Sequence, residues 1–284
     1  MPERDVTLDR LISHAGARLG AAGLHEPRRE AWRIWTDLAG PSPFGPSIFS
    51  EAAVPSETAE RFRLAVDRRA RGAPLPYATG VAGFRQLVLR SDRRALIPRP
   101  ETEGLVELLL GRQPEGRVAD IGTGSGCIAL ALAEEGRYDQ VVGVDRSGAA
   151  LSLARENRQV TGLNIDLVAG DLTQALGDHS LDAIIANPPY LTEGEYDRLD
   201  ASVRAWEPRE ALVGGGDGLE AYRALLGDAR RVVRADGWLA LEVDTSRAGA
   251  TGRLAEAMGW TNVTVHDDLF GRARYLLARR SEAL

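Results

Sequence analysis

Apolar side chains recur at helical spacing over the first 70 residues. Three sets show the pattern: Leu8, Leu11, Ile12 and Ala15; then Ala31, Ile34, Trp35 and Leu38; then Phe62, Leu64, Ala65 and Val66. Spacings of three and four residues place each set on one face of a helix. The stretch from Gly40 to Pro46 is rich in glycine and proline and must be a loop. We therefore predict a small all-helical domain over residues 1–74.

The pattern changes over residues 75–97. Pro76, Gly80 and Gly83 interrupt the helical spacing, and the segment from Phe84 to Leu89 is rich in residues that favour strands. We predict a linker that forms a short β-hairpin.

From residue 117 onward, short apolar runs alternate with helical patterns. Strands are expected at 117–121, 140–145, 164–168, 181–186 and 238–243, and helices near 125–135, 147–160 and 217–233. Such alternation predicts an α/β fold with a mostly parallel sheet and helices on both faces. The last two β-like runs, 262–266 and 274–278, are joined by a short loop through Gly271 and should form an antiparallel hairpin at the sheet edge. We assign this α/β domain to residues 98–284.

Composition limits the cellular location and the kinds of cross-link or metal site that we expect for this fold. The chain has 284 residues, of which 44% are hydrophobic, and no apolar run is long enough to span a membrane. Its first residues are charged and lack the apolar segment of a signal peptide, so we expect a cytoplasmic protein. The single cysteine, Cys127, excludes an internal disulfide, and the four histidines lack metal-ligand spacing, so we expect no metal. Nothing in the sequence demands more than a monomer.

The charge pattern limits the possible chemistry. The net charge of −6 weighs against a protein that tracks nucleic acid by bulk electrostatics. The 35 basic residues are all arginines. The absence of lysine removes Schiff-base chemistry and lysine-dependent phosphate loops.

A glycine-rich turn follows the first predicted strand of the α/β domain. Its residues are Gly122, Thr123, Gly124, Ser125 and Gly126. Glycines at a strand–turn–helix junction allow a tight turn and close approach of a ligand to the backbone. A nicotinamide dinucleotide uses the same architecture, but its fingerprint requires glycine where this chain has Cys127.

Acidic residues follow the next two strands. Asp145 stands where a carboxylate can accept both hydroxyls of an adenosine ribose, and Asp171 is suited to an adenine amino group, with Leu172 against the ring. These positions favour an adenosine-containing cofactor at the carboxyl edge of the sheet.

The fourth predicted strand ends in Asn187, Pro188, Pro189 and Tyr190. The Asn187 side chain can accept an N–H, the Pro188 carbonyl can be a second acceptor, and Tyr190 can lie against a flat group. This set suits a planar nitrogen that must be held near an electrophilic methyl group. A simple turn at the end of a buried strand remains an alternative for the four residues taken alone.

With the glycine turn, these residues resemble class I S-adenosylmethionine-dependent methyltransferases, and the wider chain resembles the HemK/PrmC family. The resemblance also rests on 96–103, on 76–80 with Phe84, on 203–208, 211–212 and 217–219, and on 268–274. It implies a methyltransferase domain over 98–284, a cleft bordered by 98–102, and S-adenosylmethionine held by Gly122, Thr123, Gly124, Ser125, Gly126, Asp145, Asp171, Leu172 and Asn187. It further implies methyl transfer to the glutamine of the Gly-Gly-Gln motif in peptide chain release factors, which the helical domain helps to hold.

Two segments depart from the family pattern. Val243–Arg247 replaces a glycine and glutamine common after the fifth strand, and Val81–Gly83 stands where Arg and Glu are common. These differences put peripheral contacts in doubt.

Other functions stay open on the sequence alone. The same pocket can serve a ribosomal-protein glutamine, or an adenine of DNA or RNA, although the first 75 residues carry 11 Arg against 10 acids and offer no basic recognition domain. We expect no sequence-specific nucleic-acid binding and no membrane partner. A non-catalytic cofactor-binding module is a third possibility, against which the intact Asn187–Tyr190 segment speaks.

Overall fold

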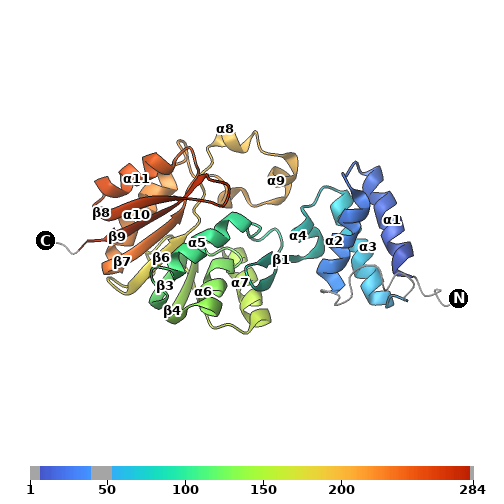
Figure 1. Ribbon diagram of the computed structural model, residues 1–284, viewed down its shortest axis with the longest axis horizontal. Helices are drawn as coiled ribbons and strands as arrows, with labels where there is room; N and C mark the ends of the chain where they lie inside the picture. The colour runs from blue at the N-terminus through green and yellow to red at the C-terminus, as the bar shows by residue number, and fades with distance from the viewer. Residues whose placement is uncertain (1–6, 40–52, 282–284) are drawn as a thin grey trace. The chain divides into compact units, whose positions relative to one another are not determined.

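The computed structural model describes residues 7–39 and 53–281, which fall into two compact units (Figure 1). The first unit includes the chain up to Val81 together with Ala201–Trp206, and the second includes Ala82–Asp200 and Glu207 onward. The predicted loop at 40–46 lies outside the described residues.

The first unit is helical, as predicted. Its helices are α1 (Leu8–Ala21), α2 (Pro27–Ala39), α3 (Ser56–Ala70), α4 (Leu75–Thr79) and α9 (Ala201–Trp206). The buried faces contain most of the apolar residues expected from the spacing. Leu64 is the exception, because its side chain is 48% exposed. It lies two residues after buried Phe62, and a step of two turns the side chain to the opposite face of a helix.

The predicted hairpin consists of β1 (Val81–Phe84) and β2 (Leu87–Arg90). Arg85 in its turn is fastened to helix α5 (Pro100–Leu110). The Arg85 backbone N–H donates to the Glu103 carboxylate over 2.9 Å, and its guanidinium lies 2.7 Å from Glu107. These bonds hold the turn of the hairpin against helix α5 within the second unit.

The second unit is built on a seven-stranded sheet in the order β5-β4-β3-β6-β7-β9-β8. Its strands are β3 (Glu115–Ile121), β4 (Arg137–Asp145), β5 (Asp166–Ala169), β6 (Leu181–Ala186), β7 (Val233–Glu242), β8 (Trp260–Asp267) and β9 (Ala273–Arg280). The first five run parallel, and β9 pairs antiparallel with both β7 and β8. The predicted mostly parallel sheet with an antiparallel end is confirmed.

Helices cover both faces of this sheet (Figure 1). Helices α5, α6 (Cys127–Glu135) and α7 (Gly148–Thr161) accompany the hairpin on one face. Helices α10 (Glu220–Val232) and α11 (Ala248–Ala257) pack on the other. The short helices α8 (Glu193–Tyr196) and η1 (Arg209–Ala211) lie in the connection between β6 and α10.

The observed α10 begins three residues later than predicted. Gly218 has a φ of +70°, a left-handed conformation that a helix cannot contain, so the helix starts only at Glu220. Within the parts of the chain that the structure describes, no helix has the length and apolar character needed to cross a bilayer.

The strand order changes direction at the centre of the sheet. The chain passes from β3 outward to β4 and β5, and then returns to β6 on the other side of β3. In open parallel sheets, the crevice beyond the carboxyl ends of such strands is where ligands bind.

Candidate active site

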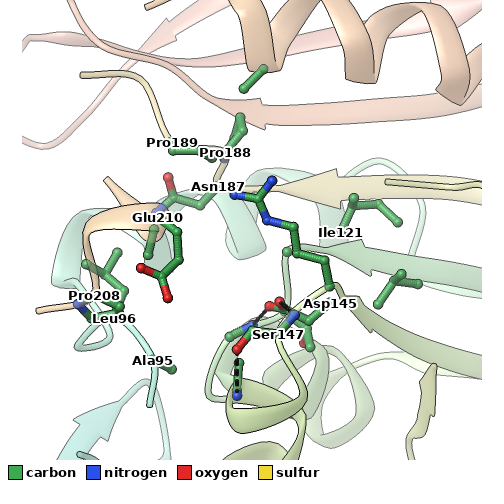
Figure 2. Close-up of a pocket in the computed structure, with 18 of the residues that line it drawn as sticks. Ala95, Leu96, Ile121, Asp145, Ser147, Asn187, Pro188, Pro189, Pro208 and Glu210 are labelled. Carbon is green, nitrogen blue, oxygen red and sulfur yellow. Dashed lines mark hydrogen bonds between the residues drawn. The ribbon is translucent and has the colours of Figure 1, made fainter. Parts of the chain in front are cut away.

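A cavity of about 430 Å³ lies at this crevice (Figure 2). Its lining residues all belong to the second unit. Figure 2 shows Asp145 and Ser147 on one side, Ala95, Leu96 and Pro208 on another, and Asn187 followed by Pro188 and Pro189 above them. A volume of this size is typical of a small-molecule or cofactor site.

The glycine turn between β3 and α6 requires its glycines. Gly122, Gly124 and Gly126 have φ values of +76°, +56° and +82°. Side chains with a Cβ avoid this region, so the alternation of glycine in the sequence follows from the backbone path. Gly122 has no atom within 4 Å of the place where a Cβ would stand, so the backbone there is open to a ligand.

The carboxylate of Asp145 is held by backbone donors. Its Oδ2 accepts from the Gly124 N–H over 2.9 Å, and its Oδ1 accepts from the Ser147 N–H over 2.8 Å. These bonds tie the end of β4 to the glycine turn and fix the direction of both oxygens. Each carboxylate oxygen has a further lone pair, so Asp145 can still accept from a ligand.

The buried side chain of Asp120 also holds the glycine turn through hydrogen bonds. Its Oδ2 accepts from the Thr123 hydroxyl at 2.6 Å and from the Ala129 N–H at 3.2 Å, while Oδ1 has no partner among the described residues. Burial raises the pKa of Asp120 to about 7, against the lowering effect of these two hydrogen bonds. The carboxyl group holds the turn in place without lining the cavity.

Asn187 follows β6 and belongs to a buried hydrogen-bonded chain. Its Nδ2 donates to the Thr102 hydroxyl over 3.2 Å, and that hydroxyl donates to the Glu242 carboxylate over 2.6 Å. The three residues come from the end of β6, the first turn of α5 and the end of β7. No local sequence pattern connects these three residues, because they are far apart along the chain.

The backbone after Asn187 is braced by a glycine-rich segment. The Leu191 N–H donates to the Leu212 carbonyl and the Gly214 N–H donates to the Leu191 carbonyl, each over 2.9 Å. A Cβ on Gly214 would stand 2.6 Å from the carbonyl carbon of Pro189 and 2.8 Å from Cα of Tyr190. The close approach of these two segments therefore depends on glycine at position 214.

The structure gathers most of the predicted site residues around one cavity. Gly122, Thr123, Gly124, Ser125, Asp145, Asp171, Leu172, Asn187, Pro188 and Pro189 line it. Gly126 and Tyr190 do not. Gly126 is the N-cap of α6, and Tyr190 packs against the core beneath α10, where burial raises its pKa. Stacking of Tyr190 on a substrate stays a prediction.

Several lining residues were not among the predicted site residues, namely 94–97, Ser147 and Glu210. Pro98, Arg99 and Thr102 also line the wall, where the family resemblance had placed the border of the cleft. Arg99 Nη2 lies 2.6 Å and 2.8 Å from the two carboxylate oxygens of buried Glu207, which directly precedes the lining residue Pro208. The resemblance around 98–102 pointed to this region, but no periodicity or spacing could have paired Arg99 with Glu207.

Comparisons with known proteins identify related chains. The methyltransferase small domain family matches residues 100–219, and the PrmC N-terminal domain family matches residues 10–80. A protein of Moorella thermoacetica, named release factor glutamine methyltransferase, is 41% identical over 98% of this chain and 100% of its own length. A protein of the same name from Cereibacter sphaeroides is 39% identical over 92% of this chain and 94% of its own.

Solved structures share the fold. A methyltransferase from Pyrococcus furiosus superposes with a TM-score of 0.53 at 19% identity, covering 68% of this chain and 88% of that one. A T. thermophilus 16S rRNA methyltransferase in complex with AdoMet and guanosine gives 0.51 at 22% identity, covering 70% and 49%. The predicted methyltransferase fold of the α/β domain is confirmed.

Proposed function

The chain belongs to the release factor glutamine methyltransferase family, and from this premise we propose that it transfers a methyl group from S-adenosylmethionine to a glutamine side-chain amide in peptide chain release factors. The acceptor is the glutamine of the Gly-Gly-Gln motif. The observation that carries the proposal is the position of Asn187, whose amide lies at the wall of the same cavity as Asp145 and the glycine turn.

The donor set of the cavity fits S-adenosylmethionine. Asp145 would accept from the ribose hydroxyls, since its oxygens are already oriented by the Gly124 and Ser147 N–H groups. Gly122 leaves open space for a ligand beside the backbone. We assign Asp171 and Leu172 to the adenine, because both line the cavity after β5. The cofactor, when bound, supplies an electrophilic methyl group on its sulfonium.

Asn187 and Pro188 would hold the acceptor amide. The Nδ2 group of Asn187 is occupied by Thr102, so its Oδ1 is free to accept an N–H of the glutamine side chain. The Pro188 carbonyl would accept the second N–H. An amide nitrogen is a poor nucleophile, and fixing both N–H groups orients it for attack. The nitrogen can lose its proton after the methyl group has arrived, so these residues need not include a strong general base.

We propose that the first unit contributes to recognition of the release factor, and that the protein acts as a monomer. The match of residues 10–80 to the PrmC N-terminal domain family supports a role shared with those relatives.

The proposal is tested by methyl transfer from labelled S-adenosylmethionine. Purified release factor, a ribosomal-protein mixture and DNA are offered separately, together with a release factor whose Gly-Gly-Gln glutamine is replaced by alanine. We expect label in the intact release factor and none in the replaced one. Label confined to ribosomal protein or to DNA would refute the assigned substrate.

The role of Asn187 is tested by Asn187→Ala. We expect calorimetry to give an unchanged affinity for S-adenosylmethionine while turnover is lost, because the acceptor amide is no longer held. Turnover comparable to the wild-type protein would show that another group holds the amide.

A further inference from the structure

We propose that Thr102 and Glu242 are positioning residues that fix which end of the Asn187 amide faces the cavity. The inference rests on the proposed function, in which Asn187 accepts a substrate N–H. Neither residue contacts the acceptor in this scheme, and both act through Asn187.

The chain of contacts is short and buried. Thr102 is 2% exposed and Glu242 is 3% exposed, and the Thr102 hydroxyl lies 2.6 Å from Glu242 Oε2. On its other side, the same hydroxyl oxygen lies 3.2 Å from Nδ2 of Asn187. Water has little access to Thr102 and Glu242, so the three groups satisfy one another.

The direction of the chain follows from the proton count. A hydroxyl has one proton, and an ionised carboxylate can only accept. The Thr102 proton is therefore committed to Glu242, and the Thr102 oxygen can only accept from Asn187. The Asn187 NH₂ group must face Thr102, which leaves the carbonyl oxygen of the amide for the cavity.

An amide without such a constraint has two orientations of nearly the same shape. With Oδ1 toward the cavity, Asn187 accepts from a substrate NH₂ group. With Nδ2 toward the cavity, Asn187 would place its own N–H groups against those of the substrate, and no hydrogen bond could form. The buried Glu242 carboxylate accepts the Thr102 proton and thereby excludes the second orientation of the Asn187 amide. The site therefore selects a substrate group that offers N–H donors.

The ionisation of Glu242 sets the direction of the chain. Burial raises the pKa of Glu242, and the Thr102 hydrogen bond opposes this effect. The surrounding charged and titratable groups are Arg99, Glu101, Tyr190, Tyr222, Arg274 and Tyr275. Arg274 and Arg99 favour the carboxylate, whereas Glu101 disfavours it.

Protonation would allow the chain to reverse. A neutral Glu242 can donate to the Thr102 oxygen, which then donates to Oδ1 of a rotated Asn187 amide. Turnover should therefore fall as pH decreases through the raised pKa of Glu242, because the cavity then faces the amide donor.

A matched pair of substitutions tests the hydroxyl. Thr102→Ser keeps the oxygen and proton, whereas Thr102→Val keeps the shape and removes both. We expect T102S to retain kcat and T102V to lose about 10- to 100-fold in kcat, because the amide that orients the acceptor is no longer held in one orientation. The affinity for S-adenosylmethionine and the KM for release factor should change little in either variant. Equal kcat values for the two variants would overturn the proposal.

Glu242→Gln tests the charge. Glutamine can either donate to or accept from Thr102, so both orientations of Asn187 become available. We expect a reduced kcat and the loss of the acidic fall in the pH profile of kcat. An unchanged acidic limb in E242Q would show that Glu242 does not set the direction.

A spectroscopic readout separates this inference from the proposed function. The side-chain NH₂ resonances of Asn187, assigned by their absence in N187A, should keep their position in T102S and shift in T102V. No shift in T102V refutes the positioning role even if no acceptor protein is labelled. Conversely, a shift in T102V without label in release factor refutes only the assigned substrate.

Discussion

Replacing Gly214 with alanine places one methyl group against the backbone that follows Asn187. The added Cβ would stand 2.6 Å from the Pro189 carbonyl carbon and 2.8 Å from Cα of Tyr190. These neighbours are backbone atoms and cannot rotate aside. The segment at 212–214 and the Pro189–Leu191 backbone must therefore separate.

The size of the effect follows from these distances. Ordinary van der Waals contact requires about 3.4 Å or more, so the two segments must move apart by about 1 Å. A misplacement of about 1 Å at a catalytic group can cost about 100-fold in rate, which corresponds to about 2.7 kcal/mol of activation free energy. Overpacking should also lower the free energy of unfolding by about 1–3 kcal/mol.

The assay compares Gly214→Ala with Gly227→Ala. Gly227 lies in α10, and its added Cβ would meet nothing within 4 Å. We expect G227A to keep full activity and to gain about 0.5–1 kcal/mol of stability, since alanine favours a helix over glycine. For G214A we expect a large loss of kcat with an unchanged affinity for S-adenosylmethionine. A folded G214A protein with kcat within a few-fold of wild type would show that the close approach of these two backbone segments does not control the position of Asn187.

Three further predictions concern Asp145 and Arg99 in the wall of the cavity and Asp120 beside its glycine turn. Asp145→Ala should weaken S-adenosylmethionine binding by about 10-fold or more through loss of a charged acceptor, and an unchanged dissociation constant by calorimetry would contradict the ribose assignment. The pKa of Asp120 rises from 3.8 to about 7 on folding, so the folded protein binds this proton more tightly than the unfolded chain. The resulting contribution to the free energy of unfolding is fully present below about pH 4 and is lost as the pH rises to about 7. Urea unfolding between about pH 5 and about pH 8 should show this decline in the wild-type protein relative to Asp120→Asn, and parallel pH profiles would refute it. Arg99→Ala should lower the unfolding free energy by about 2 kcal/mol, because Glu207 is left buried without its cation. Arg223→Ala removes an exposed ion pair and should lower the unfolding free energy by less than about 1 kcal/mol. Equal losses in the two variants would contradict the role given to burial.

Periodicity in the sequence predicted the three long helices of the first unit and all the strands of the sheet, but it missed helices α5 and α11 and the short helices α4, α8 and α9. The mostly apolar run at 181–186 predicted β6 with the bounds that the structure has, because a strand buried on both faces is largely apolar, here with Asp182 as its one charged residue. The prediction of a buried side chain was wrong at Leu64. This residue is apolar and adjacent in sequence to core residues, but its own position lies on the exposed face of the helix. It was also inaccurate at the start of α10, where Gly218 adopts a left-handed conformation.

The candidate site was predictable where the backbone itself demands particular residues. Gly122, Gly124 and Gly126 stand out in the sequence because their positive φ values favour glycine over residues that have a Cβ. Asn187 stands out because an amide and two prolines end a buried strand. Asp145 was placed by its position after the next strand, since parallel strands end at one edge of the sheet.

Local sequence patterns thus gave the strands, most of the long helices, the edge of the sheet at which ligands should meet, and the residue types available there. Only the tertiary structure decided which of those groups touch. It joined Asn187 to Thr102 and Glu242, and it set Gly214 against Pro189. Local spacing reflects the period of a helix or strand, whereas contacts across a sheet depend on strand order and packing, which no local pattern records.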